Sequence, residues 1–442
     1  MCMEARMDER TIFKSTALFL LVLGGCGSPP ADENVEDFSV YAPLKLTFES
    51  PDEAIQTELS RIQSEKGLPQ QMQAAEEQLR GAEDLTAVFQ GGFGSIDEIN
   101  SLHTRLMRMW PKRDLDFARA LPGLNSLLRD QRRPRSLLKD ALRSSDSRFR
   151  LDFAHGLGTD FQWLKATEVF ARMELVQIAD AIDRYHPDRG IDPLIVMLRL
   201  AHKLDEAPQL ISRLQAVEVR RFALKGVQQL ATAPESTEEI RETLLELLNQ
   251  QLELWPDERK AWKGDRALGM HVYEMVRSGE YLSLLTDDEI TDLDARRERF
   301  DRALVVTRNI DVDELYYLDT MRQVMEMSAV PFYERNETWN ERFTVLDEKR
   351  NQPEFPRVAA DMMFAAFTTA QQRIARDRSR CDAWRMALQQ SLELPVNEAI
   401  HQVTGTPLSF DNELGVIRVI GLEPEDRDLN PVLLPAANAP EG

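Results

Sequence analysis

Residues 193–227, PLIVMLRLAHKLDEAPQLISRLQAVEVRRFALKGV, decide the fold class. Their apolar side chains recur every three or four positions, the spacing that places them on one face of an α-helix. The first stripe begins just before this segment and consists of Ile191, Leu194, Ile195, Leu198 and Ala201, and the second consists of Ile211, Leu214, Val217 and Leu224. The pattern predicts two successive amphipathic helices, at 190–204 and 206–231.

Helix-start signatures recur on both sides of this segment. In a capping box, a Ser or Thr side chain and a Glu or Gln three residues later each bond a backbone N–H group that the helix leaves unpaired. Six such pairs occur, the last an Asp variant: Ser50/Glu53, Ser95/Glu98, Thr159/Gln162, Ser236/Glu239, Thr286/Glu289 and Asp311/Glu314. Together with the apolar spacing, they predict further helices at 51–65, 69–80, 96–109, 113–129, 135–143, 160–185, 237–252, 257–277, 287–304, 311–328, 331–347, 356–378 and 380–392.

Helices joined by short connections pack as antiparallel pairs in a bundle or an α-solenoid. The chain shows no fixed repeat of the kind that regular solenoids have, so we predict an all-α, irregular helical array, bundle or solenoid. One segment differs. Residues 403–421, VTGTPLSFDNELGVIRVIG, place two apolar runs around a turn-like Asp411-Asn412-Glu413, which predicts a small C-terminal β-hairpin.

The N-terminus has the pattern of an export signal. Arg6, Arg10 and Lys14 precede a short apolar run at residues 16–23. That run is far shorter than the roughly 20 residues that a helix needs to cross a bilayer. A basic flank, a short apolar core and small residues before a break are typical of a cleaved signal peptide.

Leu23-Gly24-Gly25-Cys26 follows this apolar run. It resembles the lipobox of bacterial lipoproteins, in which an aliphatic residue and two small residues precede a Cys. The resemblance implies that Cys26 receives a diacylglycerol, that the signal is cut just before it, and that the new amino terminus carries a fatty acid such as palmitate. Two or more acyl chains hold a protein firmly on a membrane. We therefore expect a lipoprotein anchored in the cell envelope and facing the periplasm or the exterior, on either the inner or the outer membrane.

Two further stretches carry a resemblance. Residues 193–227 resemble a region of uncharacterised exported helical proteins of planctomycete bacteria. Residues 405–410 and 419–421 resemble the end of the same proteins and, more distantly, the C-terminal hairpin of type II secretion pseudopilins. Glu398-Ala399-Ile400 stands where pseudopilins have Asp-Pro, and no prepilin helix opens the chain. The resemblance therefore implies neither a pilin role nor a calcium site, and it brings no known activity.

These features predict six segments: a signal peptide (1–25), the lipidated Cys26 with a tether (26–49), an N-terminal helical region (50–158), a main helical domain (159–400), the hairpin (401–422) and a disordered tail (423–442).

Charge and motifs exclude several functions. The formal net charge of −21 argues against a nucleic-acid partner, which requires a basic face. After processing, only Cys26 and Cys381 remain, so an acylated Cys26 leaves no intramolecular disulfide. The sequence contains no Cys-x-x-Cys pair, no His-Glu-x-x-His motif, no P-loop and no Gly-x-Ser-x-Gly motif. We predict no cofactor, no metal ligands and no catalytic residues.

Two clusters of basic residues stand out against this acidic background. Residues 129–150 contain eight arginine or lysine residues against three aspartates, and residues 373–385 contain five arginines against two aspartates. The first cluster offers a candidate patch for an anionic partner: Arg129, Arg132, Arg133, Arg135 and Lys139. Such a patch could meet lipid headgroups, an anionic wall polymer or an acidic protein. The alternative is that these cations pair internally with the surplus acids.

Three function classes are compatible with these observations. The first, which we favour, is a lipid-anchored envelope protein for interaction or scaffolding, with a protein partner in the envelope. The second is an all-α envelope hydrolase with dispersed carboxylates, which a cleft holding two carboxylates of displaced pKa would favour. The third is a periplasmic ligand-binding protein, which an enclosed apolar cavity would favour. The sequence therefore favours a protein that is not an enzyme without deciding the point.

Overall fold

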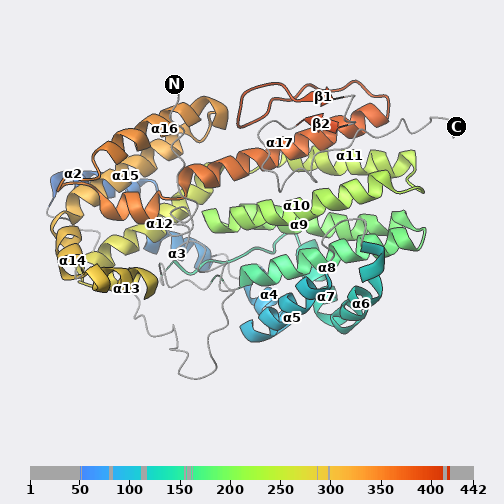
Figure 1. The fold of residues 1–442 in the computed structure, drawn as a ribbon, viewed down its shortest axis with the longest axis horizontal. Coiled ribbons are helices and arrows are strands. Elements are labelled where there is room, and N and C mark those ends of the chain that lie inside the picture. Colours follow the sequence, from blue (N-terminus) through green and yellow to red (C-terminus); the bar gives the residue numbers. More distant parts are fainter. Residues whose placement is uncertain are drawn as a thin grey trace.

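The computed structural model describes residues 50, 52–78, 83–110, 117–153, 156, 161, 163–285, 287–296, 299–411 and 416–418. The predicted signal peptide, Cys26, the tether and the tail at 423–442 lie outside these residues. Within them the chain is helical apart from one two-stranded hairpin, which confirms the predicted all-α array with a small hairpin (Figure 1). Among these helices, none is both long enough and apolar enough to span a membrane.

The helices follow one another with short connections. In the first half of the chain they are α2 Glu53–Ser64, α3 Pro69–Gln78, α4 Leu85–Phe93, α5 Ile96–Met109, α6 Phe117–Asp130, α7 Arg132–Arg143, α8 Trp163–Asp183, the short η4 Pro187–Gly190, α9 Ile191–Glu206 and α10 Leu210–Thr232. In the second half they are α11 Glu238–Glu253, α12 Glu258–Arg277, the short η5 Tyr281–Leu284, α13 Asp287–Arg296, α14 Arg299–Arg308, α15 Ile310–Met327, α16 Phe332–Glu348, the π-helical η6 Val358–Met363 and α17 Phe367–Ser391.

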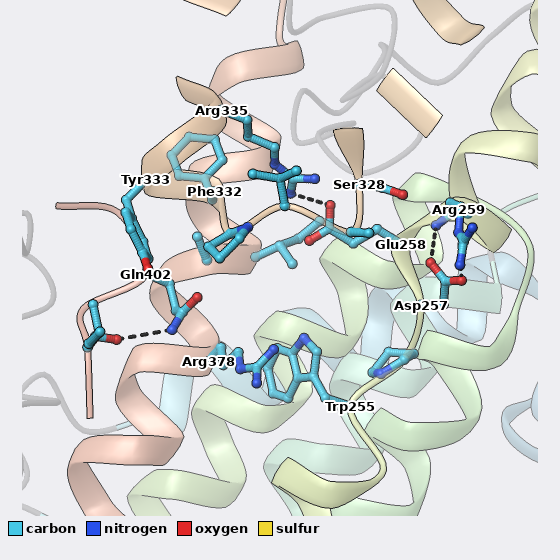
Figure 2. Close-up of a pocket in the computed structure, with 17 residues that line it drawn as sticks. Trp255, Asp257, Glu258, Arg259, Ser328, Phe332, Tyr333, Arg335, Arg378 and Gln402 are labelled. Carbon is cyan, nitrogen blue, oxygen red and sulfur yellow. Dashed lines mark hydrogen bonds and ion pairs between the residues drawn. The ribbon is translucent and has the colours of Figure 1, made fainter. Parts of the chain in front are cut away.

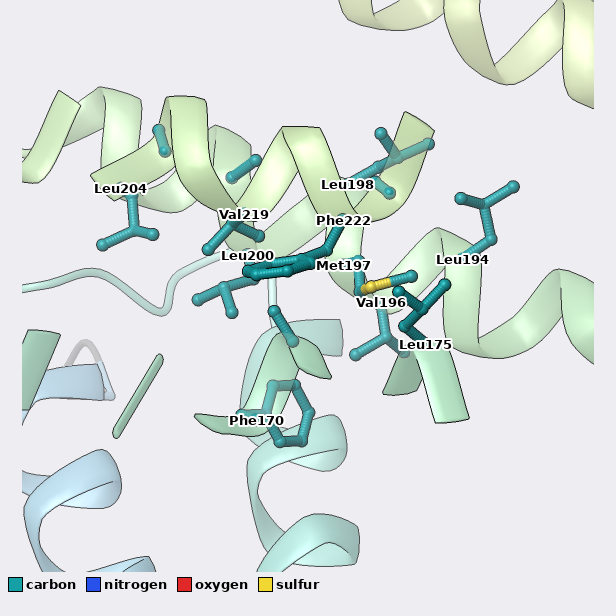
Figure 3. Close-up of a cluster of buried hydrophobic side chains, with 14 of the residues drawn as sticks. Phe170, Leu175, Leu194, Val196, Met197, Leu198, Leu200, Leu204, Val219 and Phe222 are labelled. Atoms are coloured by element: carbon teal, nitrogen blue, oxygen red, sulfur yellow. The ribbon is translucent and has the colours of Figure 1, made fainter. Parts of the chain in front are cut away.

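The predicted helix pair at 190–231 is confirmed as α9 and α10, and it lies in the larger of two hydrophobic clusters. Apolar side chains of α9 pack against those of α8 and α10, with Phe222 among the leucines of α9 and Phe170 below them (Figure 3). Helices α4 to α7, α11 and the second half of α17 add to this cluster. The amphipathic stripes in the sequence are therefore the faces that build the core.

A second cluster forms around α12, α15, α16 and η6, and α2 packs onto it. Helix α17 belongs to both clusters, because Ile374 lies in the second and Trp384 in the first. The sequence predicted two helices here, at 356–378 and 380–392, and the position of the break was wrong, because η6 ends at Met363 and α17 runs from Phe367 to Ser391. Helix α17 continues through Ser379, whose hydroxyl donates to the carbonyl of Ala375 (3.1 Å) and accepts from the backbone N–H of Gln402 (2.8 Å).

Of the six predicted capping boxes, the one at Ser95 is confirmed. The hydroxyl of Ser95 accepts from the N–H of Glu98, and the Glu98 carboxylate accepts from the N–H of Ser95. The boxes at Ser50 and Ser236 were wrong by one or two residues, because Asp52 and Thr237 lie closer to the first turn and cap α2 and α11.

The box at Asp311 was also wrong, since α15 begins one residue earlier and the Asp311 carboxylate bonds Arg277 instead (2.9 Å). The boxes that begin at Thr159 and Thr286 lie outside the described residues.

The hairpin is confirmed as strands β1 Ser409–Asp411 and β2 Val416–Arg418. They are antiparallel with Phe410 opposite Ile417, and Phe410 packs against the larger cluster.

Candidate functional site

A pocket of about 400 Å³ opens where distant parts of the chain meet (Figure 2). Its walls are the α11–α12 connection with the start of α12 at 255–259, the α15–α16 connection with the start of α16 at 328–335, Ile374, Ala375 and Arg378 of α17, and Ile400 and Gln402 beyond that helix. Trp255 packs against the larger cluster and Ile374 belongs to the smaller one. The pocket therefore lies at the junction of the two clusters, and we call it the Trp255/Arg378 pocket.

One buried arginine fixes the upper wall of the pocket. Arg335, on α16, is 2% exposed and forms an ion pair with Glu258 in the first turn of α12. It also donates to the carbonyl of Met327 at the end of α15 (3.2 Å). Asp257 caps α12 by accepting from the backbone N–H of Arg259 (2.9 Å), whose guanidinium it also bonds (2.9 Å). Through Arg335, Glu258 thus connects α12 with α16 and the end of α15, whereas Asp257 bonds only the first turn of its own helix.

The floor of the pocket rests on a buried network of charges. The indole ring of Trp255 lies between two guanidinium groups, with Arg220 4.7 Å and Arg378 5.7 Å from the ring centroid. Arg220 is 2% exposed and pairs with the carboxylates of Asp205 (2.6 Å) and Asp377 (2.7 Å). Burial raises the pKa of Asp377 to about 6, although Arg220 acts in the opposite direction. This network holds the ring in place from below.

Arg378 differs from the other charged residues of the pocket. Its side chain is exposed and forms no ion pair with a carboxylate of the described residues, although its charge acts to lower the pKa of Asp382, about one turn further along α17. Figure 2 shows its guanidinium beside the indole of Trp255, below the aromatic rings of Phe332 and Tyr333. The pocket thus presents one exposed cation without an ion-pair partner among the described residues next to aromatic surface, an arrangement suited to an anionic group on an apolar or planar body.

The carboxylates with raised pKa values lie elsewhere. Burial raises the pKa of six of them, Glu76, Asp265, Asp313, Glu314, Asp377 and Asp382, and none of the six lines the pocket. Asp313, for instance, accepts from the backbone N–H groups of Val358 (2.8 Å) and Ala359 (2.9 Å) and so caps η6. Among the described residues, therefore, the carboxylates of displaced pKa do not line this pocket.

Asp265 gives a prediction on the pH dependence of stability. Its carboxylate accepts from the N–H of Leu210 (2.9 Å), and burial raises its pKa to about 7 from 3.8. Because folding raises this pKa, stability is lost as the pH rises from about 3.8, where the unfolded carboxyl ionises, to about 7, where the folded one does, and the loss is constant above that range. Asp265→Asn keeps the hydrogen-bond acceptor and cannot ionise. We expect the difference in stability between this variant and the wild type to shift in favour of the variant by about 2 kcal/mol from pH 5 to pH 8. Thermal unfolding of both proteins at the two pH values measures this difference, and an equal gap at both would contradict it.

The structure divides the predicted anionic-partner patch. Arg135 and Lys139 face inward and both contact the fully buried Glu174, each at 2.7 Å. The other three members, Arg129, Arg132 and Arg133, are exposed. Internal pairing, the alternative given by the sequence, therefore holds for two of the five.

The sequence did not identify the pocket, whose residues come from separate helices. Its one local signal was Arg378, within the second basic cluster.

Cys381, one turn further along α17, is fully buried, and burial raises the pKa of its thiol well above the usual value, so it is not a reactive cysteine.

No group of three or more His, Cys, Asp or Glu side chains that could hold a metal ion occurs in the described part of the chain. Comparisons with protein-family models, with curated proteins and with solved structures gave no significant match.

Proposed function

We propose that this protein is a lipid-anchored component of the cell envelope that acts by binding, and that the Trp255/Arg378 pocket recognises an anionic group on its envelope partner. The observation that carries the proposal is the exposed guanidinium of Arg378 beside Trp255, which has no ion-pair partner among the described residues. The anchor rests on the lipobox at Leu23-Gly24-Gly25-Cys26. The tether keeps the body at the membrane, where a modest affinity at one pocket is enough because the local concentration is high.

The chemistry of the pocket favours recognition over hydrolysis. Glu258 is held by the buried Arg335, and Asp257 caps α12, so the two carboxylates that line the pocket serve structural contacts. Binding an anion at Arg378 requires no rearrangement of those contacts. Because the walls come from both hydrophobic clusters, an occupant would also bridge the two halves of the molecule.

A crosslinking pull-down of the acylated protein from detergent-solubilised membranes tests the proposal. We expect the wild type to recover a partner in near-equal amount, and Arg378→Glu to recover at least about tenfold less, the effect of losing roughly 1.4 kcal/mol of binding. Arg373→Glu is the matched control, because Arg373 is also an exposed arginine of α17 and does not line the pocket.

Cys26→Ala separates the anchor from the pocket. Without the tether, recovery should fall although the pocket is intact. If Arg378→Glu recovers the partner as well as Arg373→Glu does, the pocket is not the recognition site. If no partner is recovered with any of these proteins, the interaction itself is contradicted.

A further inference from the structure

A second charged surface lies apart from the pocket. Arg105 and Arg108 on α5, Arg129 on the last turn of α6, and Arg132 and Arg133 on the first turn of α7 are all exposed. We call these five residues the basic edge. A contact of 3.8 Å between Arg105 and Asp130 joins α5 to the α6–α7 junction. Figure 1 places α5, α6 and α7 together at the lower edge of the molecule, across the helical layers from α17.

The charge of the basic edge is largely uncompensated. The long contact between Arg105 and Asp130 is its one ion pair with a described residue, and both side chains are more than half exposed. Such a pair contributes little, since surface ion pairs are worth at most about 1 kcal/mol. On the inner face of α7, by contrast, Arg135 and Lys139 are neutralised by Glu174. Helix α7 therefore carries paired cations inward, whereas its exposed Arg132 and Arg133 have no ion pair with a described residue, in a chain whose net charge is −21.

An apolar side chain accompanies these arginines. Leu137 is 54% exposed and follows Arg133 by four residues on α7, so the two side chains are neighbours on one helix face. A single exposed leucine is ordinary on a protein surface. Next to several unpaired arginines, however, it fits the interface of a bilayer, where the cations meet the headgroups and the leucine enters the boundary of the acyl region.

We propose that the basic edge docks the helical body onto an anionic lipid surface. The five arginines are distributed over three helices and do not line the pocket, so they match an extended array of negative charges better than one small anion. Leu137 favours a membrane over a soluble polymer, which offers no apolar phase to enter. Each arginine near an anionic membrane strengthens the association roughly fivefold. The inference is independent of the pocket and of its partner.

The test measures how close the basic edge comes to lipid. The full acylated protein carries Ser136→Cys on the exposed face of α7, labelled with a fluorophore, and is reconstituted into vesicles that contain brominated lipid as a quencher. Cys381 is fully buried and does not compete for the label. We expect strong quenching in vesicles of phosphatidylcholine with phosphatidylglycerol and little in phosphatidylcholine alone, and high salt should abolish it. A label at Thr344→Cys, exposed on α16, reports the background.

Charge reversal identifies the residues responsible. Arg129→Glu with Arg132→Glu and Arg133→Glu should shift the docking equilibrium by roughly 100-fold and lower quenching to background. The matched control reverses three exposed arginines of other helices, Arg199, Arg308 and Arg373, and should leave quenching unchanged.

Three results would each overturn the proposal. They are equal quenching in neutral and anionic vesicles, quenching at background in both, and an equal loss of quenching in the two triple variants. Protection of the label by a soluble acidic polymer but not by vesicles would assign the edge to a different occupant and also overturn it. The mass of the N-terminal peptide reports acylation of Cys26 separately, so failure of the anchor and failure of docking are distinguishable.

Discussion

Gly264→Ala is expected to prevent normal folding or to lower the free energy of unfolding by more than about 3 kcal/mol. A Cβ atom on Gly264 would lie 1.5 Å from the carbonyl oxygen of Pro208 and 2.6 Å from its carbonyl carbon. These are backbone atoms of the α9–α10 connection, which cannot rotate away as a flexible side chain can. Helix α12 would have to move, and the carboxylate of Asp265 would then lose the N–H of Leu210, the first residue of α10.

Soluble yield and thermal unfolding measure this effect, and Gly91→Ala is its control. Gly91 lies within α4, and a Cβ there would meet nothing within 4 Å. Because alanine has the higher helix propensity, Gly91→Ala should raise stability by about 0.5–1 kcal/mol. The two substitutions are chemically identical and should have opposite signs. A Gly264→Ala protein with the Tm of the wild type would show that α12 does not approach Pro208 this closely.

Local patterns predicted the parts of the fold that depend on local interactions. The stripes of α9 and α10 were readable because apolar spacing reports directly which face is buried. Helix α4 is absent from the helices predicted from the sequence, and it contains Gly91 and Gly92, which have a low helix propensity. In the structure they are tolerated because Asp84 caps this helix and Phe89 and Phe93 bury its apolar face. The region predicted as one helix at 287–304 contains α13 and α14.

The candidate site was less accessible from the sequence because its parts are far apart in the chain. Trp255 and Arg378 are both near helix ends or exposed faces, and nothing local indicates that they meet. The inward orientation of the Arg135 side chain could have been predicted from the sequence. It shares a face of α7 with the buried Leu138 and Leu142, and this spacing indicates an inward side chain that needs a carboxylate such as Glu174.

Arg220→Leu is expected to lower the free energy of unfolding by about 3–5 kcal/mol, because removal of one member of a buried ion pair leaves an uncompensated buried charge. Here two carboxylates, those of Asp205 and Asp377, would lose their shared cation. Arg221→Leu is the control one residue away. Its partner, Glu218, is 41% exposed, so loss of that pair should cost at most about 1 kcal/mol. Thermal unfolding of the two variants measures the difference.

Two further measurements separate the charge from the volume of Arg220. Without the guanidinium, burial favours the protonated form of Asp377 still more strongly, so the deficit of Arg220→Leu should be smaller at pH 5 than at pH 8. Leucine at all three positions removes every charge of the network and should restore much of the lost stability, since apolar replacement of a whole buried ion network is often neutral or stabilising. The triple variant would still lack the cation beneath Trp255, so it should unfold like the wild type yet bind its partner less well. If the triple variant is as unstable as Arg220→Leu alone, the loss of stability comes from lost packing around the indole. The charges of the network would then not be what stabilises the fold.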